Sequence, residues 1–80
     1  MKVRIPPQIA TGFEDDLQSA LEGWIYARAA AGRAYKVYEV QYLCIAVGAH
    51  TMRHGSKAVA DLIRKSTIAG QSKINWEELQ

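Results

Sequence analysis

Apolar residues recur at helical spacing through most of this 80-residue chain, and this periodicity constrains the fold more than any other feature. Between Thr11 and Gly32 the apolar positions follow one face of a helix. Thr11 and Glu14 form a capping-box pattern at its start, and Gly32 is a typical residue just beyond a helix end. The sequence therefore predicts a helix over residues 11–31, with a stripe of Phe13, Leu17, Ala20, Leu21, Trp24, Ala27 and Ala31.

A second periodic segment covers residues 34–66 and contains no proline. Its helical phase is unbroken across Gly48 and Gly55, whereas a loop of arbitrary length normally resets the phase. We therefore expect one continuous helix, in which Gly55→Ala is tolerated. Its main apolar side, with spacings that alternate between four and three, is Tyr38, Tyr42, Ile45, Ala49, Met52, Ser56, Val59 and Ile63.

A strand is the alternative for residues 35–47, which are rich in β-branched and aromatic side chains. Residues 43–47, however, do not alternate with polar residues as a half-buried strand does. A helix is the interpretation that we adopt, and the strand remains open at this stage.

Outside the two helices the sequence predicts a short extended arm over residues 1–10, where Pro6 and Pro7 disfavour a helix. Residues 67–80 form a tail in which Asn75 caps a final turn. The expected fold is thus a single all-α domain built on an antiparallel helical hairpin.

The two expected helices differ in length, at about 30 Å and about 50 Å for a rise of 1.5 Å per residue. The far end of the second helix therefore needs cover, either from Ile74, Trp76 and Leu79 or from a second chain. A second apolar flank with Val37, Cys44 and Val47 needs cover too. We expect a multi-helix bundle that is completed by dimerisation.

The opening segment "MKVRIPPQI", followed by a capped helix, resembles the start of ribbon-helix-helix repressors. In that family a basic, alternating strand pairs in a dimer and enters the DNA major groove, so the resemblance implies that Lys2 and Arg4 read bases. It covers the first quarter of the chain. The family's first helix ends after three turns, whereas here the apolar stripe continues to Ala31, so the helical hairpin remains our prediction.

Residue types used in metal binding and catalysis occur but do not converge in the expected helix. Cys44 lies about 120° from His50 on the helical wheel, and His50 with His54 alone makes an incomplete metal site. Ser56 and Asp61 lie on opposite sides, so they cannot form a triad with His54. We expect neither an enzyme nor a bound metal or cofactor.

Two surfaces are candidate binding sites. One is a basic face that suits nucleic acid or an acidic partner, composed of His50, Arg53, His54, Lys57, Arg64 and Lys65. The other is a shallow flank of small side chains that suits a second helix, composed of Val37, Cys44, Gly48, Thr51, Gly55, Ala58 and Leu62.

These features favour a small helical protein that acts by binding another protein, as a regulator, inhibitor or assembly factor. A nucleic-acid-binding module that uses the basic face is the alternative, although a net charge of +2 is mild. The single cysteine and the absence of a signal-peptide pattern lead us to expect a cytoplasmic protein. The apolar runs are too short for a membrane span, so we expect no membrane partner.

Overall fold

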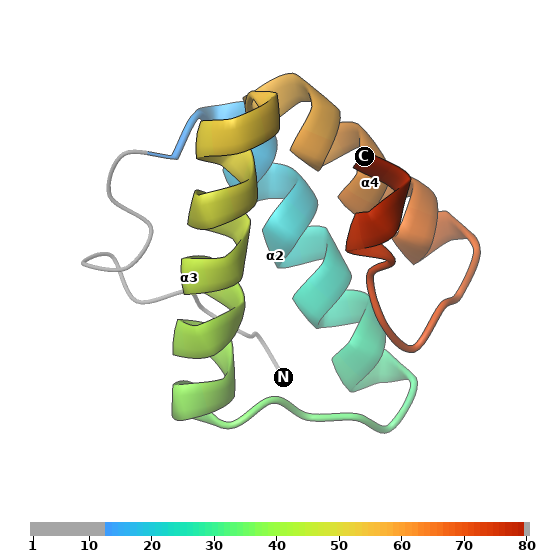
Figure 1. Ribbon diagram of the computed structural model, residues 1–80. Helices are drawn as coiled ribbons and strands as arrows, with labels where there is room; N and C mark the ends of the chain where they lie inside the picture. Colours follow the sequence, from blue (N-terminus) through green and yellow to red (C-terminus); the bar gives the residue numbers. More distant parts are fainter. Residues whose placement is uncertain (1–12, 80) are drawn as a thin grey trace.

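The computed structural model describes residues 13–79, and this part of the chain is helical without any strand. It contains α2 (Asp15–Ala30), α3 (Val37–His54), α4 (Ser56–Ile68) and a short 3-10 helix, η1 (Trp76–Leu79). Figure 1 shows α2 between α3 and α4, with η1 beside α4. The all-helical prediction is confirmed, and the strand alternative for residues 35–47 is wrong because α3 occupies that segment from Val37 on.

Helix α2 begins later than predicted. Its N-cap is Glu14, in an extended conformation, so Glu14 is not the third residue of a helix capped by Thr11. Thr11 lies outside the described residues, as do Lys2, Arg4 and the arm predicted over residues 1–10. Asp15 and Asp16 do occupy the first turn, where the positive end of the helix dipole favours carboxylates.

The predicted end of the first helix is confirmed at Gly32. This residue has a φ of 95°, which side chains other than glycine's rarely permit. The next residue, Arg33, donates its backbone N–H to the carbonyl of Arg28 at 2.8 Å, and Gly32 donates to Ala29 at 3.0 Å. This pair of hydrogen bonds is the usual way in which a glycine closes a helix.

The continuous helix predicted over residues 34–66 is wrong, because the helix is interrupted at Gly55. Gly55 has a φ of 90° and a ψ of 151°, a conformation that is essentially restricted to glycine. It ends α3 by donating to the carbonyl of Thr51 at 2.8 Å, and its own carbonyl accepts from Val59 at 3.3 Å in α4. A hinge of one residue is too short to disturb the apolar spacing, which is why the periodicity gave no sign of it.

The hinge turns α4 back along α2, so no overhanging helix end remains. Val59 and Ile63 of α4 are fully buried, together with Leu21 and Ile25 of α2. Helix α2 packs along α4 more extensively than either of them packs against α3. The hairpin of the first two predicted helices is therefore not the main packing unit.

The tail covers part of the core, which is one of the two kinds of cover that the sequence analysis predicted. Ile74, Trp76 and Leu79 are partly buried against the core cluster. Asn75 caps η1 as predicted, since its side-chain oxygen accepts the backbone N–H of Glu77 at 3.3 Å. The tail begins after Ile68 rather than at residue 67, because α4 continues to Ile68 and closes at Gly70, which has a φ of 68°.

Helix α3 presents its second apolar flank to the core. Val40, Cys44 and Val47 are buried, and Trp24 of α2 lies among them in the same cluster, as its spacing predicted. Tyr35, just before α3, accepts a hydrogen bond from the indole N–H of Trp24 at 3.2 Å and so ties the start of α3 to α2.

Candidate functional site

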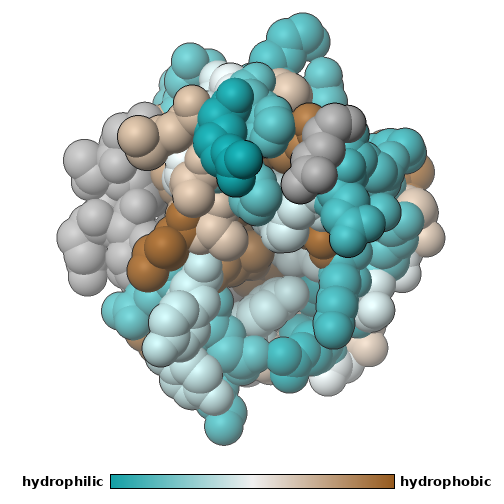
Figure 2. Space-filling view, in the orientation of Figure 1, coloured by the Kyte–Doolittle hydropathy of each residue, from teal (hydrophilic) through white to brown (hydrophobic). Residues whose placement is uncertain are grey.

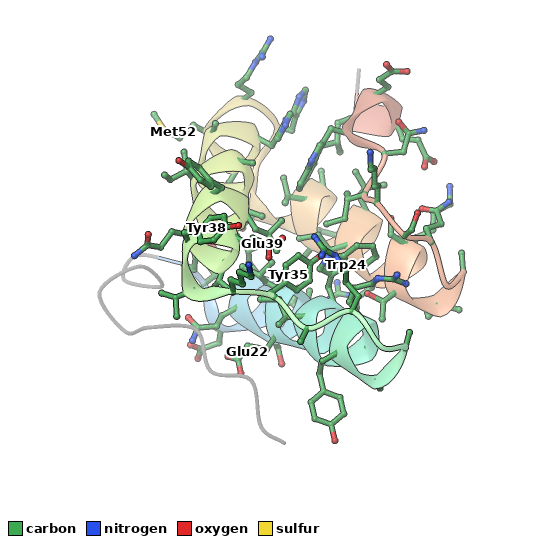
Figure 3. The ribbon with its side chains drawn as sticks, turned by 90° about the horizontal axis from the view of Figure 1, so that it is seen from below. Glu22, Trp24, Tyr35, Tyr38, Glu39 and Met52 are labelled. Carbon is green, nitrogen blue, oxygen red and sulfur yellow. The ribbon has the colours of Figure 1, made fainter. Side chains whose placement is uncertain are left out.

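The outer side of α3 carries a row of exposed, mostly apolar side chains, which we call the α3 stripe: Tyr38, Tyr42, Ile45, Ala49 and Met52. Tyr42 is 69% exposed, Ile45 68% and Met52 90%. Figure 3 places Tyr38 and Met52 on α3, away from Trp24 and Tyr35 in the interior. Side chains of this size on a monomeric domain are normally buried or isolated, and a continuous row indicates an interaction surface.

Charged side chains are missing from the middle of this helix. Residues 40–52 include no aspartate, glutamate, lysine or arginine, and His50 is their one titratable residue apart from tyrosine and cysteine. A helix face that only contacts water usually carries charges along its length. The composition of α3 therefore suits contact with a second apolar surface better than contact with solvent.

The α3 stripe is held on a rigid support. Behind it Val40, Cys44 and Val47 are buried in the core, and these positions fix the rotation of the helix. Tyr38 and Tyr42 meet edge to face, with ring centroids 6.3 Å apart and an interplanar angle of 81°. Rigidly held tyrosines lose little conformational entropy on binding, and tyrosine is enriched among the residues that dominate interface energies.

A hollow opens between the start of α3 and the tail. It has a volume of about 300 Å³ and is lined by Trp24, Tyr35, Leu43, Ser72, Lys73, Ile74 and Trp76. Figure 2 shows a depression near the middle of this face, with apolar atoms at its base. Most of its lining residues are apolar or aromatic, which suits contact with an apolar side chain.

Most cations of the predicted basic face are paired with carboxylates. Arg64 contacts Asp16 at 2.8 Å and Asp61 at 2.7 Å. Lys65 contacts Glu78 at 2.6 Å, while Lys57 lies 3.4 Å from Asp61. The hydrogen bond from Arg64, with the nearby charge of Lys57, lowers the pKa of Asp61.

The basic face is therefore smaller than its sequence suggests. Arg53 is exposed at the end of α3, and the hinge at Gly55 separates it from Lys57. Because Arg64 and Lys65 already contact carboxylates, a phosphate would have to compete with Asp16, Asp61 and Glu78 for them.

The two histidines take part in an aromatic stack that the sequence did not predict. The ring centroids of His50 and Trp76 lie 4.3 Å apart, at an interplanar angle of 9°. The rings of His50 and His54 are also stacked, with centroids 6.3 Å apart and an interplanar angle of 17°. Trp76 belongs to the tail, 26 residues further along the chain, and no local sequence pattern predicts a contact over that separation. The stack joins α3 to η1.

The metal-ligating residue types do not gather in the described part of the chain. Cys44 is buried in the core, and its burial raises the pKa of the thiol, so it stays protonated at neutral pH. Within residues 13–79 no group of three histidine, cysteine or carboxylate side chains is close enough to hold a metal ion.

The predicted flank of small residues is divided by the fold. Cys44 and Leu62 are buried, and Gly55 forms the hinge. Thr51 donates its hydroxyl to the carbonyl of Val47 at 2.7 Å, and Gly48 lies next to the ring of Phe13. The flank therefore faces the core over much of its length, with Val37 exposed at one end and Ala58 half-buried beyond the hinge.

Comparison with known proteins gives no relative: neither a family model nor a curated protein nor a solved structure matches this chain. Among the described residues, no helix has the length and apolar character that crossing a membrane requires.

Proposed function

We propose that this protein acts as a small helical interaction protein without catalytic activity, and that it binds another polypeptide through the α3 stripe. The observation that supports the proposal is the exposure of Tyr38, Tyr42, Ile45 and Met52 in one row on a helix whose opposite face is already buried. Burial of this row on a partner would remove a large apolar surface from water, which is the dominant favourable term in association.

The expected partner surface is another helix with an apolar stripe. Spacings of four and three residues along α3 match the ridges and grooves of a second helix that packs at a shallow angle. A helix on this side would cover α3 on both faces and complete the multi-helix bundle that its two apolar flanks require. Binding of this kind suits a regulator, an inhibitor or an assembly factor.

The distribution of charge gives less support to nucleic-acid binding than to protein binding. Arg64 and Lys65 are engaged with carboxylates, and the exposed row on α3 is uncharged. If the basic face nevertheless bound DNA or RNA, Arg53→Glu with Lys57→Glu would weaken that binding, and its affinity would fall steeply with salt.

Site-specific photo-crosslinking tests the proposal with a matched pair of tyrosines. A photoreactive amino acid replaces Tyr42 on the α3 stripe or Tyr26 on α2, which is also exposed at 57%. We expect a discrete protein adduct, to another protein or to a second copy, from position 42 and none from position 26. Ile45→Asp in the same chain should abolish the adduct. No adduct at position 42, or equal adducts at both positions, contradicts the proposal.

A further inference from the structure

We infer that the chain which covers the α3 stripe is a second copy of this protein, with the two α3 helices packed antiparallel about a two-fold axis level with Val47. This inference rests on the proposed function, because it names the partner of the same surface. Three properties of α3 favour a copy of itself over an unrelated helix: the spacing of the stripe, the size of the side chains at the crossing point, and the position of the flanking charges.

The stripe has the spacing of a self-associating helix. Its members follow one another at intervals of four, three, four and three residues, which is the alternation of a coiled-coil seam. In an antiparallel pair centred at Val47, Tyr42 lies opposite Met52 of the second copy and Ile45 lies opposite Ala49. The two-fold axis makes each of these two contacts occur twice. In the second contact the small side chain of Ala49 leaves room for the larger side chain of Ile45.

Small residues flank the seam where the two helices would cross. Ala46 and Gly48 lie on either side of it, one residue after Ile45 and one residue before Ala49. In this register Ala46 meets its own counterpart near the two-fold axis, while Gly48, on the other side, lies next to the ring of Phe13 of its own chain. The absence of bulk there lets two helix backbones approach closely, which is the purpose that small residues serve at tight helix crossings.

The charges beside the seam favour the same antiparallel orientation. Glu39 and Arg53 lie on one flank, near opposite ends of α3. Antiparallel packing centred at Val47 places Arg53 of each copy opposite Gln41 of the other, two residues or about 3 Å along the axis from Glu39, so two ion pairs can form. Glu39 already accepts from Arg33 at 2.6 Å and from the backbone N–H of Lys36 at 3.2 Å, and a carboxylate has lone pairs for further donors. Parallel packing brings no such pair together.

Sedimentation equilibrium tests the association. The wild-type protein should have twice the chain mass of 8.9 kDa at high micromolar concentration. Ile45→Asp should weaken association by at least about a hundredfold, because it would bury an unpaired carboxylate. Ile68→Asp is the matched control, since Ile68 is 87% exposed on α4 and outside the stripe, and it should remain dimeric. Circular dichroism verifies that both variants keep their helical content.

Crosslinking between engineered cysteines tests the orientation, in a background where Cys44 is replaced by alanine. A mixture of Tyr42→Cys and Met52→Cys should give a covalent dimer with a short bifunctional maleimide. Met52→Cys alone should not, because ten residues of helix, about 15 Å, separate the two sites along the axis of an antiparallel pair. Parallel packing predicts the reverse result, and that result overturns the inference.

The inference and the proposed function fail in different ways. A wild-type protein that is monomeric at high micromolar concentration overturns the second copy as partner, and so does a dimer that Ile45→Asp leaves intact. If Tyr42 then still crosslinks to a different protein, the proposed function stands. If Tyr42 crosslinks to no protein at all, both are wrong.

Discussion

Helices α3 and α4 lie on either side of the Gly55 hinge, and they distribute their apolar residues differently. In α4 the buried side consists of Val59, Ala60, Leu62, Ile63 and Ser66, while the outer side carries Asp61, Arg64 and Lys65. Ile68, at its last residue, is the one large apolar side chain of α4 that is strongly exposed. The fold of the single chain therefore accounts for nearly every apolar residue of α4.

Helix α3 has apolar residues on two sides, and the fold uses one of them. Val40, Cys44 and Val47 are buried, whereas Tyr42, Ile45 and Met52 face outward without a charged residue between them. A helix needs a single apolar side to join a core. The stability of the monomer therefore does not explain the apolar outer side of α3, and this is the part of the molecule that function must explain.

The sharpest contrast between the two helices is expected from two isoleucines. Ile63→Ala in α4 should lower the free energy of unfolding by about 3 kcal/mol, because it removes a fully buried side chain and leaves a cavity. Ile45→Ala on the α3 stripe should change it by about 0.5 kcal/mol or less. Urea denaturation at low micromolar concentration, where association contributes little, gives both values. Equal losses in the free energy of unfolding would mean that Ile45 and Ile63 contribute equally to the stability of the monomer, which contradicts the comparison.

The second expected effect concerns the joint between the helices. Gly55→Ala should destabilise the protein by about 2 kcal/mol, because alanine is strained at a φ of 90°. Gly48→Ala, within α3, should instead stabilise it by up to about 1 kcal/mol, since an added Cβ meets only the ring of Phe13 at an ordinary 3.9 Å. Thermal unfolding of the two variants reports the opposite signs. If Gly55→Ala were neutral, α3 and α4 would be one continuous helix.

A smaller effect is expected where α3 is tied to α2. Tyr35→Phe should cost about 1 kcal/mol, because the buried indole N–H of Trp24 loses its acceptor. Tyr38→Phe is the control on the exposed side of α3 and should change stability by about 0.5 kcal/mol or less. Denaturant unfolding, monitored by tryptophan fluorescence, measures both variants. Equal effects would show that the inner attachment of α3 does not depend on this hydrogen bond.

The smallest effect is expected on the charged outer side of α4. Hydrogen bonding to Arg64 lowers the pKa of Asp61 below its ordinary 3.8, so the unfolded chain binds this proton first as the pH falls. The stabilisation is therefore present at pH values above the ordinary pKa of 3.8 and is lost as the pH falls through the lowered pKa. Asp61→Asn should flatten that part of the acid-unfolding profile. Because the carboxylate is exposed, added salt should shrink the difference. An unchanged profile would show that the contact contributes nothing.

Much of the fold was predictable because local signals and packing agree in α2. Its apolar stripe with Trp24 and its end at Gly32 both follow from short-range spacing, although its first residue is Asp15 rather than the predicted start at Thr11. The same kind of signal failed at Gly55, since a single residue changed the direction of the chain without changing the spacing on either side. The conformation of Gly55 depends on a comparison of two free energies. One is the stabilisation from packing α4 on α2, and the other is the stabilisation from continuing α3 as a straight helix.

The candidate site could be found only in part from the sequence. The row from Tyr38 to Met52 was visible as an apolar side, but α3 has two such sides and helical periodicity does not say which one faces the core. The choice depends on tertiary contacts, such as the hydrogen bond between Trp24 and Tyr35. Likewise, two of the carboxylates that pair with Arg64 and Lys65, Asp16 and Glu78, come from α2 and η1, so their effect on the basic face emerged only in the folded chain.

The dependence of the melting temperature on protein concentration tests most directly whether the outer side of α3 is an association surface. A second chain that binds the folded state raises the melting temperature as the concentration rises, here from about 5 to about 500 µM. We predict such a rise for the wild-type protein and for Ile68→Asp, and none for Ile45→Asp. A wild-type melting temperature that does not change with concentration would contradict association of two copies through α3.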